Sequence, residues 1–157
     1  MQAPPASAPR ALDAGARDRV RSSRGAVEEK GEKRVILGVG TDILNMQRLH
    51  DILEAESDSF VRKVFTARER EQAAESPDPV SYYATRFSGK EAVFKCFGIH
   101  GNVRLSEIEI LDGETGQPYV TLSGQLNGIA ADKGIRSVLI SLSCENEYAV
   151  AFAVAQD

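Results

Sequence analysis

Tryptophan is absent from this sequence of 157 residues, and cysteine and histidine occur only twice each. Cys96 and Cys144 are too few for a disulfide framework, and neither belongs to a C-x-x-C pair or stands with histidines at zinc-ligand spacing. The composition therefore excludes a disulfide-rich secreted fold and a structural zinc site. It predicts a reduced, cytoplasmic setting.

Long apolar runs and a basic surface are missing as well. The longest apolar runs, residues 35–39 and 148–155, are far shorter than the ~20 residues that a membrane helix needs. The net charge is −4, and residues 1–34 hold eight Lys or Arg and five Asp or Glu, a balance of +3, which leaves −7 for residues 35–157. We therefore expect a soluble protein that binds neither membrane nor nucleic acid.

Residues 1–34 are rich in Ala, Pro, Ser, Gly and charge, and they show no apolar periodicity. Such a segment cannot bury enough surface to offset the entropy lost on ordering, so we predict a disordered extension. A targeting peptide and a misassigned start are the alternatives, although transit peptides contain few acidic residues. Residues 35–157 are predicted to form one domain, because a chain of this length buries about one core.

Residues 35–40 form a short apolar run that is typical of a buried strand, and an amphipathic stretch follows it. We expect Asp42 at the corner between this strand and the helix, where its simplest role is to cap the helix. Thr66 and Glu69 have the spacing of a capping box at the start of a second helix, to which we assign no chemistry.

A long helix is predicted from Pro79 to about Gly98, because residues 76–79 break the preceding helix and proline suits a first turn. A hairpin at residues 108–122, a short helix that stops near Gly134 and a second hairpin at residues 138–155 follow. Because strands mostly follow strands through short connections, we predict an α+β fold with a mostly antiparallel sheet packed against the long central helix.

The long helix carries an unusual group of charges, since Arg86, Lys90, Glu91 and Lys95 lie in an otherwise apolar run, residues 86–98. Side chains four apart share a helix face, which indicates that the cations and the carboxylate can point toward one mouth. The plainer interpretation is a helical Glu–Lys pair worth about 0.2–0.5 kcal/mol and two solvated cations.

A phosphate bound beside a metal ion would account for these charges. Mg²⁺ takes one or two carboxylates and completes its octahedral shell with water and substrate phosphate. Asp42 and Glu91 can supply the carboxylates, while Lys90 and Lys95 can neutralise charge that develops on a transferred phosphoryl group.

Four motifs, in this order along the chain, resemble the successive signatures of the holo-acyl-carrier-protein synthase family of 4′-phosphopantetheinyl transferases: GVGTDI at 38–43, FTARE at 65–69, RFSGKEAVFKCFG at 86–98 and TGQP at 115–118. The resemblance implies the fold of that family and a homotrimer that binds coenzyme A between neighbouring subunits. It implies transfer of 4′-phosphopantetheine from coenzyme A to a serine of apo acyl carrier protein, with Mg²⁺ and release of 3′,5′-ADP. Such a reaction serves fatty acid biosynthesis.

The same resemblance implies roles for individual residues. Asp42 and Glu91 match the magnesium ligands, Glu91 also orients or deprotonates the attacking serine, and Lys95 binds phosphate. Arg48 matches the arginine that docks the carrier protein, and Lys63 is a second docking candidate.

Three further residues are candidates for coenzyme A binding. Arg86 and Lys90 match the motif and serve either the structure or the outer phosphates of coenzyme A. His100, in the glycine-rich turn after the long helix, is a candidate ligand of a phosphate.

The sequence departs from the family where members commonly read His-x-Ser-x-Ser/Thr-His, because Leu139 and Cys144 stand in place of the two histidines. Glu145 is a candidate substitute acid or base, and an exposed turn carboxylate is the plainer interpretation. We expect Cys144 to be a small buried residue rather than a nucleophile. The alternatives to an active transferase are a catalytically weak homologue that binds coenzyme A or a carrier protein without turnover, and a trimeric interaction protein.

Overall fold

The computed structural model describes residues 33–99, 101 and 103–157, and the part from Lys33 to Asp157 forms one compact unit. The extension predicted for residues 1–34 falls almost wholly outside the described residues, as does His100. Within the described part, no helix is long and apolar enough to cross a membrane.

Helices and strands follow the predicted order closely. The elements are β1 (Ile36–Asn45), α1 (Met46–Val64), α2 (Ala67–Glu75), α3 (Pro79–Cys96), the 3₁₀ turn η1 (Leu105–Glu107), β2 (Ile108–Asp112), β3 (Pro118–Leu122), α4 (Gly124–Asp132), β4 (Ser137–Glu145) and β5 (Tyr148–Gln156). All strand pairs are antiparallel: β5 lies between β1 and β4 in one sheet, and β2 pairs with β3 in a separate hairpin. The prediction of an α+β fold is confirmed.

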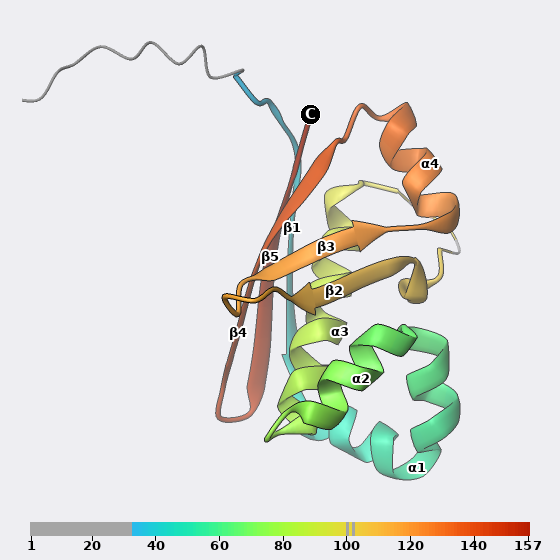
Figure 1. The fold of residues 1–157 in the computed structure, drawn as a ribbon, viewed down its shortest axis with the longest axis vertical. Helices are drawn as coiled ribbons and strands as arrows, with labels where there is room; N and C mark the ends of the chain where they lie inside the picture. Colours follow the sequence, from blue (N-terminus) through green and yellow to red (C-terminus); the bar gives the residue numbers. More distant parts are fainter. Residues whose placement is uncertain (1–32, 100, 102) are drawn as a thin grey trace, which may run out of the picture. The chain divides into compact units, whose positions relative to one another are not determined.

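The long helix α3 lies at the centre of the unit (Figure 1), where it contacts both sheets as well as α1 and α2. Val93 of α3 and Phe97, which caps its C-terminal end, are almost fully buried, and they belong to a core that also includes Ile108 and Ile110 of β2. Because α3 is covered on several sides, a polar side chain on it is either paired in the interior or directed into an opening.

Small residues on the inner face of the three-stranded sheet let α3 approach the backbone of β1. Gly40 is buried against the helix, and a Cβ atom added there would lie 2.0 Å from the carbonyl oxygen of Ala92. Gly38 stands in the same relation to Cys96. Four buried alanines, at alternate positions of β5, continue this surface: Ala149, Ala151, Ala153 and Ala155. The close approach fixes the height of α3 above β1.

The outer face of the same sheet is apolar and exposed in the single chain. Strand residues alternate between the two faces, so the neighbours of the buried positions point away from α3. These outward residues are Leu37, Val39, Ile43, Leu139, Val150 and Phe152, each between 40% and 66% exposed. We call this set the outer sheet face.

One predicted boundary is wrong. Strand β1 continues to Asn45, so Asp42 lies within the strand instead of at a strand-to-helix corner. The helix cap is Asn45, whose side chain accepts hydrogen bonds from the backbone N–H groups of Gln47 and Arg48. The apolar run of the sequence ended at Gly40, but antiparallel pairing with β5 extends the strand through the polar residues.

Candidate active site

Strand alternation places Asp42 on the face of β1 that meets α3. Gly38 and Gly40 point to the same side, and the hydroxyl of Ser88 on α3 donates a hydrogen bond to the carbonyl oxygen of Asp42 at 3.2 Å. The side chain of Asp42 is only 16% exposed. The position of this carboxylate is therefore set by packing between strand and helix.

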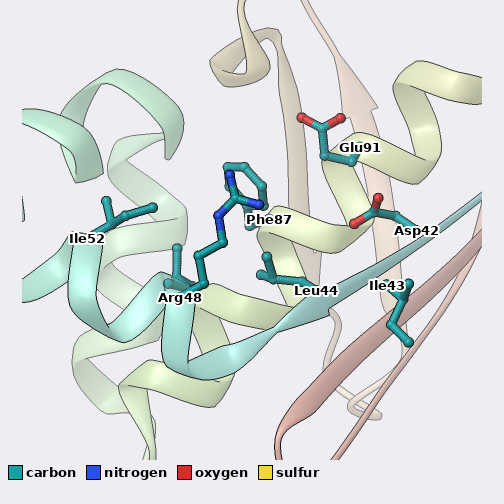
Figure 2. A pocket seen from close by; sticks show the side chains of 8 residues that line it. Asp42, Ile43, Leu44, Arg48, Ile52, Phe87 and Glu91 are labelled. Atoms are coloured by element: carbon teal, nitrogen blue, oxygen red, sulfur yellow. The ribbon is translucent and has the colours of Figure 1, made fainter.

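Glu91 of α3 lines the same pocket as Asp42. The pocket has a volume of about 310 Å³, and its wall is otherwise mostly apolar, with Leu44 and Phe87 among its residues. Figure 2 shows the carboxyl groups of Asp42 and Glu91 on one side of the pocket, the first from β1 and the second from α3. The two carboxylates that the sequence analysis paired are thus brought together within one chain.

Lys95 completes this group from the last turn of α3. Its ammonium donates hydrogen bonds to Asp42 Oδ1 at 2.9 Å and to the carbonyl oxygen of Thr41 at 3.0 Å, and its side chain is 50% exposed. Among the described residues, Lys95 forms no ion pair with Glu91 within 4.0 Å, although the two are four apart on the helix. The simple helical pair is therefore replaced by a pair between helix and strand.

The surroundings of Glu91 disfavour its negative charge. Burial raises the pKa of this carboxyl above its ordinary value, the charge of Asp42 raises it further, and the charge of Lys95 lowers it. A cation that touches both carboxylates would remove the repulsion between them. The electrostatics therefore favour a positively charged ligand on the Glu91 side of the pocket.

The donor set suits a magnesium ion shared with a substrate. Within the described residues, no group of three or more His, Cys, Asp or Glu side chains is arranged to hold a metal. Two carboxylates are what Mg²⁺ commonly takes from a protein when phosphate and water fill the remaining positions. The site therefore fits a cation that binds together with a phosphate better than one enclosed entirely by side chains.

Lys90 does not belong to this group, contrary to the hypothesis of one shared mouth. Its side chain is fully buried, and its ammonium pairs with Glu69 at 2.8 Å and donates to the carbonyl oxygens of Leu105 and Ile108. Burial lowers the pKa of Lys90, while the charge of Glu69 acts in the opposite direction. These contacts match the structural role, which was one of the two interpretations of Lys90 in the sequence analysis.

Arg86 is also directed away from Asp42. It pairs with Asp112 at the end of β2, and its guanidinium carbon lies 4.0 Å from the centre of the Tyr82 ring. The reason is geometric: at about 100° per residue, the centre of positions 86 and 90 lies about 140° from that of positions 91 and 95. The four charges therefore face two different sides of α3.

The predicted docking residues both lie on α1. Arg48 lines the pocket beside the two carboxylates and makes no ion pair within 4.0 Å with any described residue. Lys63 is exposed in the last turn of α1 and does not line this pocket. Figure 2 shows Arg48 projecting from α1 at the pocket wall, so a macromolecule bound at α1 could reach both Arg48 and the carboxylates.

The residues at the positions of the family's histidines lie on β4. Leu139 is 55% exposed on the outer sheet face, and Cys144 is exposed near the β4–β5 turn, so the prediction of a buried cysteine is wrong. Glu145 is exposed as well, and none of these three residues lines the pocket of Asp42.

Sequence reasoning missed the partners of the buried cations. Glu69 was assigned only a capping role, and Asp112, the partner of Arg86, was not singled out. The capping box itself is confirmed, since Thr66 and Glu69 exchange the two expected hydrogen bonds. A lysine within an apolar run did signal a missing counter-charge, but no local pattern identified Glu69, 21 positions away, as the acid that supplies it.

Comparison with known proteins finds similar sequences and similar solved structures. A sequence profile of the 4′-phosphopantetheinyl transferase superfamily matches residues 38–153. A holo-[acyl-carrier-protein] synthase of Caldanaerobacter subterraneus subsp. tengcongensis is 40% identical over 119 residues, which cover 74% of this chain and 92% of the relative. The crystal structure of holo-[acyl-carrier-protein] synthase from Neisseria meningitidis has a TM-score of 0.72 at 31% identity and covers 78% of this chain and 100% of its own. A holo-(acyl-carrier-protein) synthase from Bacillus anthracis, solved in complex with CoA (3′,5′-ADP), has a TM-score of 0.64 at 28% identity and covers 78% and 97%.

Proposed function

Since this chain belongs to the 4′-phosphopantetheinyl transferase superfamily, we propose that it transfers the 4′-phosphopantetheine group of coenzyme A to a serine of an apo acyl carrier protein. The observation that carries this proposal is the pocket shared by Asp42 and Glu91, together with the ion pair between Asp42 and Lys95. The chain covers most of the length of relatives named as holo-[acyl-carrier-protein] synthases, and these names support coenzyme A and a carrier protein as the substrates. The reaction belongs to fatty acid biosynthesis.

In the proposed reaction the serine oxygen of the carrier attacks the β-phosphorus of coenzyme A. A new P–O bond forms to serine, the bond from that phosphorus to the bridging oxygen breaks, and 3′,5′-ADP leaves with the bonding electrons. Glu91 orients the serine hydroxyl and accepts its proton, directly or through one water, because its carboxylate lies at the pocket and its pKa is raised. Lys95 supplies positive charge to the phosphates.

Asp42 and Glu91 are the residues that would hold Mg²⁺, and their shared pocket and like charges support this assignment. When bound, the ion supplies Lewis-acid stabilisation of charge on the phosphates. Arg48 at the pocket wall is the proposed contact to the carrier, and Lys63 is a second one further along α1. His100 stays a candidate for coenzyme A binding outside the described residues.

We further propose a homotrimer with active sites between subunits, as the family resemblance implies. The outer sheet face supports self-association, because exposed apolar patches of this kind mark protein interfaces. The reducing cytoplasm is the proposed location, since both cysteines are free thiols.

A catalytically weak homologue that binds coenzyme A or a carrier without turnover is the second candidate. It is favoured by Leu139 and Cys144, since neither offers the imidazole found in relatives. The retention of Asp42, Glu91 and Lys95 in one group speaks for turnover, because binding alone gives no reason for two paired carboxylates.

One experiment separates the two candidates. The protein is incubated with apo acyl carrier protein, coenzyme A and Mg²⁺, and the mass of the carrier is measured by mass spectrometry. We expect addition of one phosphopantetheine group, and we expect Glu91→Gln to abolish this addition with an unchanged circular dichroism spectrum, since the amide is a poor metal ligand. An unmodified carrier at high protein concentration, beside a working control enzyme, would remove the proposal of an active transferase.

A further inference from the structure

Lys95 stands out because its ammonium donates a hydrogen bond to Asp42, one of the two carboxylates of the proposed cation site. The hydrogen bond from Lys95 Nζ to Asp42 Oδ1 measures 2.9 Å, and the second bond, to the carbonyl oxygen of Thr41, holds the ammonium at the strand. A divalent cation on the carboxylate of Asp42 would lie close to this ammonium, and the two positive charges would repel each other.

The same side chain is free to move to another partner. Lys95 lies in the last turn of α3 and is half exposed, whereas Lys90 is fully enclosed and makes three polar contacts. Lysine is a compact charge on a flexible stem of four carbons, so its ammonium can exchange one anionic partner for another without movement of the backbone.

From this arrangement we infer that Lys95 competes with the divalent cation for Asp42, and that a bound pyrophosphate ends the competition by drawing the ammonium away. The inference rests on the proposed function, because it takes the pyrophosphate of coenzyme A as the group that attracts Lys95. It makes cation and coenzyme A bind cooperatively, in addition to any direct contact between ion and phosphate. The free enzyme would then hold the cation weakly.

The test measures Mn²⁺ binding to the intact protein by the electron paramagnetic resonance signal of free Mn²⁺, first without coenzyme A. We expect Lys95→Met, which removes the charge and keeps a long apolar side chain, to bind Mn²⁺ at least about fivefold more tightly than wild type. Lys95→Arg keeps the charge and should stay near wild type. Lys133→Met, which removes one exposed lysine at the end of α4, controls for net charge.

A second measurement repeats the titrations with coenzyme A present in excess, corrected for Mn²⁺ bound by coenzyme A alone. We expect coenzyme A to tighten Mn²⁺ binding by a larger factor in wild type than in Lys95→Met. Mn²⁺ binding by Lys95→Met that is equal to or weaker than that of wild type, or an equal factor in both proteins, would overturn the inference.

The carrier-modification assay on the same preparation of wild type keeps the two proposals apart. Transfer by wild type without tighter Mn²⁺ binding by Lys95→Met refutes the competition alone. Tighter Mn²⁺ binding by the variant without transfer by wild type refutes the proposed function and leaves the competition for Asp42 supported.

Discussion

Removal of the Lys90 ammonium should cost far more stability than removal of an exposed lysine. Lys90 and Glu69 are both 0% exposed, so each would leave a buried charge without its partner if the other were replaced. Breaking such a pair from one side costs about 3–5 kcal/mol. The carbonyl oxygens of Leu105 and Ile108 lose a donor as well, and this adds to the cost.

The losses of stability caused by replacing Glu69 and Lys90 should not be additive, because the two side chains form one ion pair. Glu69 keeps its hydrogen bonds from the N–H groups of Thr66 and Ile110 when Lys90 is lost, so Lys90→Met should fall toward the lower end of that range, about 3 kcal/mol. In the double variant Glu69→Gln/Lys90→Met no unpaired charge is left. Its cost should therefore be less than the sum of the two single variants by about 1–3 kcal/mol.

Urea unfolding followed by circular dichroism, at one fixed protein concentration, measures these free energies. Lys133→Met is the matched control and should stay within about 0.5 kcal/mol of wild type. The reasoning would be refuted by a loss under about 1 kcal/mol for Lys90→Met with an unchanged dependence on urea. Strictly additive losses in the double variant would refute the coupling.

The shifted pKa of Lys90 predicts how the stability of Glu69→Gln changes with pH. Burial lowers this pKa below its ordinary value of 10.5, and the charge of Glu69 opposes the shift, so Glu69→Gln should lower it further. A lowered lysine pKa means that the unfolded chain binds more protons than the folded one in the window between the two values, and stability there rises with pH. The deficit of Glu69→Gln relative to wild type should therefore shrink as the pH rises toward 10.5. A deficit that grows with pH would contradict the assignment.

Three further predictions concern the pocket and the outer sheet face. Asp42→Asn should lower the pKa of Glu91, since the charge of Asp42 raises it. A carbon NMR titration of the Glu91 carboxyl in metal-free buffer measures this pKa. The same titration midpoint in wild type and variant would show that the two carboxyl groups do not interact. Gly40→Ala should destabilise the fold by at least about 1–3 kcal/mol and slow transfer, because the new methyl group would clash with the carbonyl oxygen of Ala92. Urea unfolding measures the loss of stability, and the carrier assay measures the rate. Wild-type values in both would exclude the close approach of α3 to β1. Phe152→Glu places a charge on the outer sheet face and should convert the proposed trimer to monomers in sedimentation, a result that an unchanged mass would contradict.

The sequence was enough to predict most of the fold because local signals agreed with the tertiary structure. Pro79 and the residues before it start α3, Gly134 has the positive φ of 71° expected after a helix end, and Thr66 with Glu69 caps α2. Strand β1 was predicted too short, since Thr41 to Asn45 lack an apolar run and owe their extended form to pairing with β5. Local pattern describes what a segment prefers, and pairing with a distant strand decides where it ends.

The candidate site was predictable only in part, for a reason that α3 makes plain. Four charges within ten residues suggested one site, yet the helical angle divides them into two pairs: positions 86 and 90 face the β2 hairpin and α2, and positions 91 and 95 face the pocket and β1. This division follows from the sequence alone once the angle is worked out, whereas the identity of each partner needs the tertiary structure. Because Lys90 and Glu91 are adjacent, the buried ion pair also fixes the part of the helix that presents Glu91. Loss of that pair should therefore reduce the transfer rate even in the fraction of molecules that stays folded.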